Sequence, residues 1–242
     1  LRHLFRDAKR WKDAEDSLNE ALRLRKLLAA EYPSVPDHRQ ELASTLSNLG
    51  LLYRDTKRFK DAEIAYQEAR ALRKRLVLDY PKHVDYRLEL ATSHNNLGVL
   101  YLNQSRHEEA QAAFAEALPL RRALVKEYPE SPENRNKLAG TLVNLALVCN
   151  ALGDYAEAKR HLDEDQPHHR AALDANAKDP SYRDFYRKHL QARMRTCAGL
   201  DDRDGTVNAA AVYRDLGWEP ARNAYDAARA LASCIAIVER NS

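Results

Sequence analysis

The chain of 242 residues carries 39 lysine and arginine residues against 36 aspartate and glutamate residues, a formal net charge of only +3. This near-balance argues against a nucleic-acid binder, whose affinity depends on clustered cations that meet phosphates, and no run approaches the ~18 apolar residues that a membrane span needs. Seven glycines, nine prolines and a hydrophobic content of 44% rich in alanine and leucine predict an all-α protein with long helices.

A twelve-residue phrase recurs at a fixed interval of 48 residues. It reads RWKDAEDSLNEA from Arg10, RFKDAEIAYQEA from Arg58 and RHEEAQAAFAEA from Arg106. A Tyr-Pro pair closes each unit, at residues 32–33, 80–81 and 128–129. Self-similarity at a constant period of this length indicates a repeat architecture, in which each unit packs only on its neighbours.

Each full unit contains two amphipathic stretches with apolar residues at positions i, i+3, i+4 and i+7. In the first full unit these stretches cover residues 36–56 and 59–79. Later in the chain, Ser131 and Asp179 are each followed by proline, so an N-cap residue precedes a proline at the first helical position. Because the proline of each Tyr-Pro pair cannot continue a helix, the unit is predicted to be a helical hairpin.

We predict a single array over residues 1–242. It comprises a truncated repeat at 1–34, full repeats at 35–82, 83–130 and 131–178, a divergent repeat at 179–217 and a terminal helix at 218–242. Because the chain starts at Leu1, in the middle of a repeat, we expect it to be a fragment of a longer protein. In the divergent repeat, Ala210 follows Ala158 by 52 residues, which indicates a four-residue insertion, and Asp201–Gly205 is the predicted turn. The last helix is expected to be amphipathic through Ala224, Ala228, Leu231 and Ile235.

The repeated phrases resemble a known family. LSNLGLLY at residues 46–53, with Ala62, Tyr66 and Ala69 after it, is similar to the tetratricopeptide repeat (TPR) signature, and HNNLGVLY at residues 94–101 is equally similar. The period of 48 residues exceeds the usual ~34, which makes the helices longer and resembles the kinesin-light-chain type and arrays attached to bacterial eukaryotic-type protein kinases. The resemblance implies a right-handed α-solenoid of stacked antiparallel helix pairs.

Small and large residues alternate in this pattern. Gly50 and Gly98 are expected to let the two helices of one hairpin approach closely, and Ala146 occupies the same column. The large residues that are expected to fill the gap to the next hairpin are Tyr53, Tyr66, Tyr101 and Phe114.

The resemblance implies a protein–protein interaction scaffold that binds a protein or an extended peptide in its concave groove. The alternatives are a structural module that assembles end to end through its terminal helices, and the recruiting arm of a larger protein kinase. No phosphate-binding glycine loop, G-x-S-x-G elbow or H-E-x-x-H motif is present, so we expect no enzyme activity and no cofactor or metal. Nucleic acid and membranes are not expected partners.

The predicted groove lies on the first helices of the repeats. Asn48, Asn96 and Asn144 recur in phase, and the resemblance implies that they bond a ligand's backbone. Around them, the residues expected to be open to a ligand are Ser44, Ser47, Leu51 and Arg54, then Asn95, Val99 and Asn103, then Val143, Leu147 and Asn150. The alternative is that the asparagine column forms hydrogen bonds between repeats and binds no ligand.

Other reactive side chains have simpler interpretations. The stretch HLDEDQPHHR at residues 161–170 offers metal-ligand types, but His161 and His168 are seven residues apart across a proline, so we interpret it as a solvated, kinked helix. Arg25, Arg73 and Arg121, each followed by a second basic residue, are interpreted as a mixed-charge surface ladder. Three cysteines without C-x-x-C spacing indicate reduced thiols in a cytoplasmic protein; they are Cys149, Cys197 and Cys234.

Overall fold

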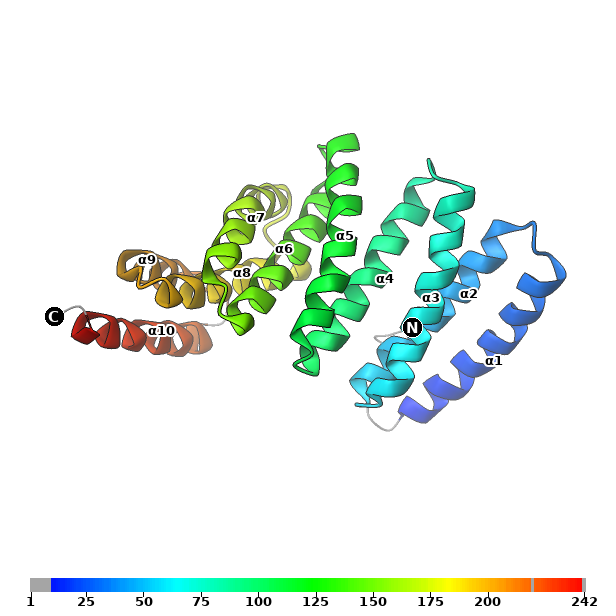
Figure 1. Ribbon diagram of the computed structural model, residues 1–242, viewed down its shortest axis with the longest axis horizontal. Helices are drawn as coiled ribbons and strands as arrows, with labels where there is room; N and C mark the ends of the chain where they lie inside the picture. Colours follow the sequence, from blue (N-terminus) through cyan, green and yellow to red (C-terminus); the bar gives the residue numbers. More distant parts are fainter. Residues whose placement is uncertain (1–9, 219, 241–242) are drawn as a thin grey trace. The chain divides into compact units, whose positions relative to one another are not determined.

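The structure, a computed structural model, describes residues 10–218 and 220–240, with the backbone alone for Pro220 and residues 233–240. Ten helices make up the regular structure of these residues (Figure 1). They are α1 Trp11–Glu31, α2 Pro36–Asp55, α3 Phe59–Asp79, α4 Val84–Asn103, α5 His107–Glu127, α6 Pro132–Leu152, α7 Tyr155–Ala175, α8 Pro180–Gly199, α9 Arg203–Arg214 and α10 Pro220–Arg240. The predicted all-α class is confirmed. The side chains of Cys234 and Ile235 lie outside the described residues.

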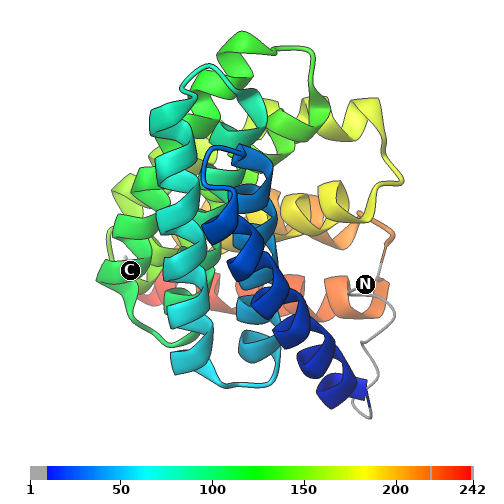
Figure 2. The same ribbon diagram turned by 90° about the vertical axis from the view of Figure 1, so that its right-hand side faces the viewer.

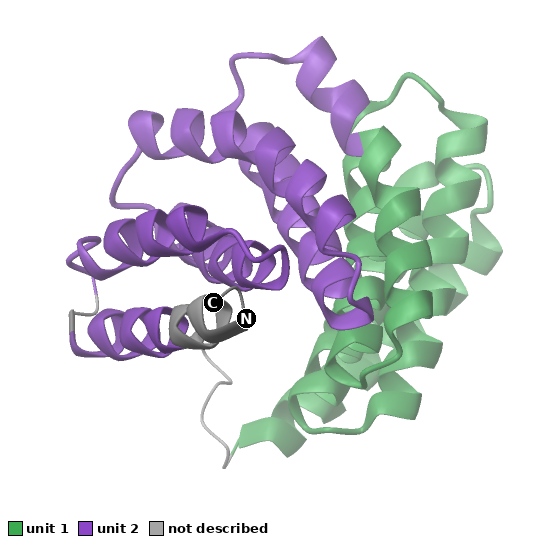
Figure 3. Ribbon diagram, turned by 60° about the vertical axis from the view of Figure 1, so that its left-hand side comes forward, with its two compact units in different colours: residues 1–120 green, residues 121–242 purple. Residues whose placement is uncertain are grey.

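The chain divides into two compact units, 1–120 and 121–242, and the boundary falls within α5 (Figure 3). In unit 1, α1 packs on α2, α2 on α3 and α3 on α4, and successive helices run in opposite directions (Figure 1). Viewed from the side, α1 is the outermost described helix of unit 1 (Figure 2). In unit 2, α6 packs on both α7 and α8, and α9 packs on both α8 and α10.

The helix limits follow local signals in the sequence. The predicted helices at 36–56 and 59–79 appear as α2 and α3, with ends within one residue of the prediction. At the start of α6, the Ser131 hydroxyl accepts a hydrogen bond from the Asn134 N–H at 3.3 Å. At the start of α8, the Asp179 carboxylate accepts bonds from two backbone N–H groups at 2.8 and 3.1 Å. Such caps satisfy N–H groups that have no partner within the helix.

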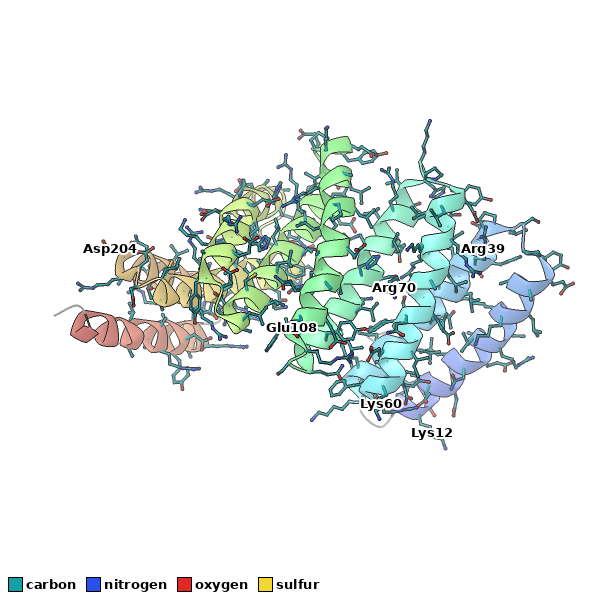
Figure 4. The ribbon with its side chains drawn as sticks, viewed as in Figure 1. Lys12, Arg39, Lys60, Arg70, Glu108 and Asp204 are labelled. Carbon is teal, nitrogen blue, oxygen red and sulfur yellow. The ribbon has the colours of Figure 1, made fainter. Side chains whose placement is uncertain are left out.

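The 48-residue period is visible in the arrangement of side chains. Lys12, Lys60 and Glu108 occupy one sequence column and lie at the same end of α1, α3 and α5 (Figure 4). The second helices of successive repeats in unit 1 therefore have equivalent starting points.

Close approach within a hairpin depends on glycine. A Cβ at Gly50 would lie 2.6 Å from two ring atoms of Tyr66, and a Cβ at Gly98 would lie 2.5 Å from the ring of Phe114. Both rings are almost fully buried. The prediction that Gly50 and Gly98 permit close approach is thus confirmed, and each of the two aromatic rings lies against the glycine of its own hairpin.

The turn of the divergent repeat is shorter than predicted. Helix α9 begins at Arg203, because the Asp202 carboxylate accepts a hydrogen bond from the Gly205 N–H at 2.8 Å and caps the helix. Asp201 adopts a positive φ of 56° just before it. The prediction of a turn over residues 201–205 is therefore wrong for the last three residues, which are helical.

The last helix packs on a different face from the one predicted. Helix α10 packs on α8 and α9, and it buries Asn223 and Ala227. Ala224 and Ala228 are exposed, and Leu231 is 39% exposed. The prediction erred because alanines occur on several faces of this helix, so their spacing alone could not select the buried one.

Two prolines lie inside second helices, and both helices continue past them. Pro119 lies within α5 and Pro167 within α7. Among the described residues, none of the helices has an apolar run long enough to cross a membrane.

Candidate partner-binding surface

A pocket of about 440 Å³ opens between α1 and α2 in unit 1. Helix α2 contributes Asn48 and Leu51, two of the residues predicted to bind a partner. Asn48 is exposed and Leu51 is half-buried. The full lining is Trp11, Ala14, Ser17, Leu18, Ala21 and Arg25 from α1, with Asn48, Leu51, Leu52 and Asp55 from α2.

The α1 side of the pocket has the residue pattern of an internal packing face. Ala14, Leu18 and Ala21 occupy the same columns as Ala62, Tyr66 and Ala69 of α3. In α3 these residues are at most 1% exposed, and Tyr66 packs on Gly50 of the partner helix in its own hairpin. In α1 the corresponding residues line the pocket. An apolar face of this kind, open over part of its length, can accept a partner segment.

The same helix exposes further apolar side chains. Leu24, Leu27 and Leu28 of α1 are 46%, 55% and 37% exposed. The residue equivalent to Leu28 in the next repeat is Leu76, which is fully buried. Helix α1 therefore has a continuous apolar surface that the described residues leave open.

The remaining predicted groove residues of unit 1 differ in their exposure. Asn103 is exposed, and the others are half-buried. The hydroxyls of Ser44 and Ser47 accept hydrogen bonds from the Arg73 guanidinium at 3.5 and 2.9 Å. Arg54 forms an ion pair with Asp55 at 2.7 Å. On α4, the half-buried residues of the predicted groove are Asn95, Asn96 and Val99.

In unit 2 the predicted groove residues are mostly internal. Val143, Asn144 and Asn150 are 0%, 7% and 1% exposed, and Leu147 is half-buried. The expectation that the first three are open to a ligand is wrong, because their side chains are buried in unit 2, where α7 and α8 both pack on α6. The Asn150 amide donates to the Ala192 carbonyl at 3.2 Å and accepts from the hydroxyl of Thr196 at 2.9 Å, and both of these partners lie on α8. Asn150 therefore forms hydrogen bonds between two repeats. This is the role that the alternative interpretation gave to the asparagine column, of which Asn144 is the member on the same helix.

An arginine column crosses from each second helix to the first helix of the next repeat. Arg25 donates to the Thr45 hydroxyl, and Arg121 donates to the Thr141 hydroxyl and the Lys137 carbonyl. Arg73 donates to the Ser93 hydroxyl at 2.8 Å.

Burial of this column overturns its interpretation as a surface ladder. Arg73 and Arg121 are 2% and 6% exposed, and burial lowers the pKa of Arg121 to about 10. Glu89 forms an ion pair with Arg73 at 2.7 Å and opposes the effect of burial on the pKa of Arg73. A buried cation needs such hydrogen-bond and charge partners, and these come from the following helix.

Mixed-charge surface pairs are instead formed by the basic residue that directly follows Arg25 and Arg121 in the sequence. Lys26 pairs with Glu68 at 3.9 Å, and Arg122 pairs with Glu164 at 2.6 Å, both at the surface. The mixed-charge interpretation is therefore confirmed for the second basic residue of these pairs. Exposed pairs of this kind contribute little stability each, about 0–1 kcal/mol.

A second repeated contact joins the hairpin turns in unit 1. The Arg106 guanidinium lies 4.3 Å from the centre of the Tyr101 ring and pairs with Glu63 of the preceding repeat at 2.7 Å. Arg58 makes the equivalent contacts with Tyr53 and Glu15. The Arg106 guanidinium lowers the pKa of the Glu63 carboxyl. This motif positions the end of α2 or α4 on the helix before it.

The acidic and histidine-rich stretch of α7 is only partly solvated. Asp165 and His169 are fully buried, so the interpretation of this stretch as a solvated helix is wrong for them. Burial raises the pKa of Asp165 to about 6, with the adjacent His189 opposing the effect, and burial lowers the pKa of His169 to about 3. The i, i+4 spacing of Asp165 and His169 places both on one helix face, whereas the predicted interpretation rested on His161 and His168, which are seven residues apart.

The comparisons with known proteins agree with the helical hairpins. A sequence profile described as tetratricopeptide repeat matches residues 42–85 and 90–133. Among curated proteins, none matches the sequence. The chain is similar to the crystal structure of BtubC (BKLC) from P. vanneervenii, at 18% identity and a TM-score of 0.64, over 95% of this chain and 89% of that one. A tetratricopeptide repeat protein from Parabacteroides merdae aligns at 18% identity and a TM-score of 0.45, over 96% of this chain and 76% of that one.

The likeness to BtubC agrees with the fold class predicted from the sequence, a right-handed α-solenoid of stacked antiparallel helix pairs. At 18% identity the likeness to BtubC concerns the fold. Tetratricopeptide repeats, the family matched at residues 42–85 and 90–133, generally form protein-interaction or scaffold modules. The in-phase hairpins at residues 42–85 and 90–133 are thus tetratricopeptide repeats by sequence match.

Proposed function

We propose that this chain is an interaction module that binds a peptide segment of a partner protein on unit 1, over the surface formed by α1 and α2. The observation that carries the proposal is the pocket of about 440 Å³, which combines apolar walls with the exposed amide of Asn48. Leu18 and Leu51 can contact apolar side chains of the segment, while Asn48 can donate to and accept from its backbone. A groove of this composition suits an extended peptide or a short helix.

The proposed surface is narrower than the groove expected from the sequence. It retains Asn48 and Leu51 at its centre and extends toward Asn96 and Val99 of α4, which are half-buried in the same unit. It leaves out the buried residues of α6. Low net charge along the lining favours a partner segment that is itself mainly apolar and uncharged.

Peptide selection from a random library displayed on phage, followed by calorimetry, tests the surface. For a selected peptide, Asn48→Ala is expected to weaken binding by about 2- to 13-fold, because one amide–backbone hydrogen bond is worth about 0.5–1.5 kcal/mol. Leu51→Ser is expected to weaken it further. Asn19→Ala is the matched control, because Asn19 is an exposed amide on α1 that does not line the pocket. Equal affinity of the Asn48 and Asn19 variants for every selected peptide would contradict the proposed surface.

A second candidate function is end-to-end association, and the exposed leucines of α1 favour it. Leu24, Leu27 and Leu28 together form an apolar strip that a second copy can cover. Light scattering over a concentration series distinguishes the two functions. Oligomers that grow with concentration, and that Leu27→Glu abolishes, support self-association; a constant monomer supports the binding module. A role as the recruiting arm of a larger kinase is compatible with the binding module.

A further inference from the structure

The arginine column is replaced by a different set of residues at the junction of α7 and α8 in unit 2. Arg25, Arg73 and Arg121 are followed in phase by His169. The hydroxyl groups that accept hydrogen bonds from these arginines also form a column, Thr45, Ser93 and Thr141. The next residue of that column is His189. A third column, Ala21, Ala69 and Ala117, is followed by Asp165. Three columns thus change together at one junction.

The three replacements meet in space. The His189 Nδ1 atom lies 2.6 Å from one carboxylate oxygen of Asp165, and the His169 Nε2 atom lies 3.7 Å from the other. One ligand atom from each residue lies within 4.8 Å of the other two. All three side chains are buried, with exposed fractions of 0% for Asp165 and His169 and 2% for His189.

The polar atoms of this cluster lack hydrogen-bond partners. Both oxygens of Asp165, both ring nitrogens of His169 and Nδ1 of His189 have none among the residues that the structure describes. The 2.6 Å contact is short, but its geometry is not that of a hydrogen bond. Five buried polar atoms without partners carry a large free-energy cost unless something else satisfies them. Lone pairs from two helices that converge in this way are typical of ligands around an ion.

We propose that Asp165, His169 and His189 bind one divalent transition-metal ion, with Zn²⁺ as the best match. Imidazole nitrogen and carboxylate oxygen are both ligands for Zn²⁺. With bonds of about 2.0–2.1 Å, two ligands of a tetrahedral ion are about 3.3 Å apart, and the observed separations of 2.6 and 3.7 Å lie on either side of this value. His189 binds through Nδ1 and His169 through Nε2. A water molecule completes the coordination.

The charge balance explains why an ion can stand in for an arginine. Each earlier junction contains one positive charge. It is carried by the arginine guanidinium that joins the second helix of one repeat to the first helix of the following repeat. A divalent ion held by one carboxylate and two neutral imidazoles also has a net charge of +1. The ion joins α7 to α8 as Arg121 joins α5 to α6. Since all three ligands are buried at the contact of α7 with α8, the role assigned to the ion is to join these two helices.

Metal titration of the full chain after EDTA treatment tests the proposal. Zn²⁺, measured by competition with a chromophoric chelator, is expected to bind at one ion per chain and to raise Tm by several degrees. Co²⁺ in its place is expected to give the intense visible bands of a four- or five-coordinate ion. Absence of both the stoichiometric binding and the rise in Tm overturns the proposal, and the cluster is then a polar contact without an ion.

The repeat itself supplies the variant for this test. The triple change Asp165→Ala, His169→Arg and His189→Thr restores the alanine, arginine and threonine of the preceding junction, so it should fold. It is expected to lose the bound ion and the metal-dependent rise in Tm. Asp165→Asn, which keeps the side-chain shape, is expected to weaken Zn²⁺ binding at least tenfold. The paired control His161→Gln and His168→Gln removes two neighbouring α7 histidines and should leave binding unchanged. Retention of the ion by the triple variant, or its loss in the paired control, also overturns the assignment.

Discussion

Replacing Gly98 by alanine is expected to destabilise the protein by about 1–3 kcal/mol, the usual cost of overpacking a core. The added Cβ would lie 2.5–2.7 Å from three ring atoms of Phe114, which is fully buried and cannot move aside without disturbing its neighbours. Alanine has a better helix propensity than glycine by about 1 kcal/mol, so a measured loss would show that the steric term dominates. Urea unfolding followed by circular dichroism measures the change.

The third repeat provides the compensating change. There the same two columns hold Ala146 and Leu162, which pack in one buried cluster. Phe114→Leu alone is expected to destabilise by leaving a cavity. The double variant Gly98→Ala with Phe114→Leu reproduces the natural pair and should be more stable than the sum of the two single changes predicts. Strict additivity in this double-mutant cycle would show that the glycine and the ring are not coupled.

The sequence predicted the helices well because each repeat contains its own local signals. The proline after Ser131 or Asp179, the Tyr-Pro pairs and the apolar stripe recur in phase, so one correct assignment fixes the others. Errors arose where the period fails, in the divergent repeat and in α10. In those segments the buried face depends on the neighbouring helices.

The candidate site was less predictable, because exposure depends on contacts that a local pattern does not record. Asn48 and Asn144 share a column, yet Asn48 is exposed and Asn144 is buried. Helices α7 and α8 both pack on α6, whereas Asn48 faces the open pocket between α1 and α2.

The arginine column was misread for a similar reason. An Arg-Lys pair on a helix is typical of a solvated face, and burial of Arg73 follows only from partners on two other helices, Ser47 and Ser93. One signal could have revealed it: a hydroxyl residue follows each arginine of the column by 20 residues. The same spacing separates His169 from His189, which identifies the proposed metal site as a variation on that contact.

His94→Leu is expected to stabilise the protein by about 1–2 kcal/mol at pH 7. His94 occupies the column of Leu46, Leu142 and Leu190, all buried, and is itself 8% exposed. Its Nδ1 atom is buried without a hydrogen-bond partner among the described residues, so the imidazole carries a desolvation cost that leucine would not. Thermal or urea unfolding at pH 7 measures the gain. Lower stability of the variant would mean that the polar ring makes a favourable contact.

His94→Leu should also reduce the loss in free energy of unfolding that the protein undergoes as the pH falls below neutral. Burial lowers the pKa of His94 to about 4, and the nearby cations Arg70 (labelled on α3 in Figure 4) and Lys74 act in the same direction, while Glu116 opposes them. Since the unfolded histidine has a pKa near 6.5, the unfolded state binds a proton that the folded state excludes between about pH 6.5 and pH 4. Above pH 6.5 the imidazole is neutral in both states and adds no pH dependence. The free energy of unfolding falls as the pH falls through this window, by about 2 kcal/mol at pH 5. His94→Gln should flatten the profile equally without the gain at pH 7, because it removes the titrating group but keeps a polar side chain. If both variants kept the wild-type slope, the acid sensitivity would have to come from other groups, such as the buried His169.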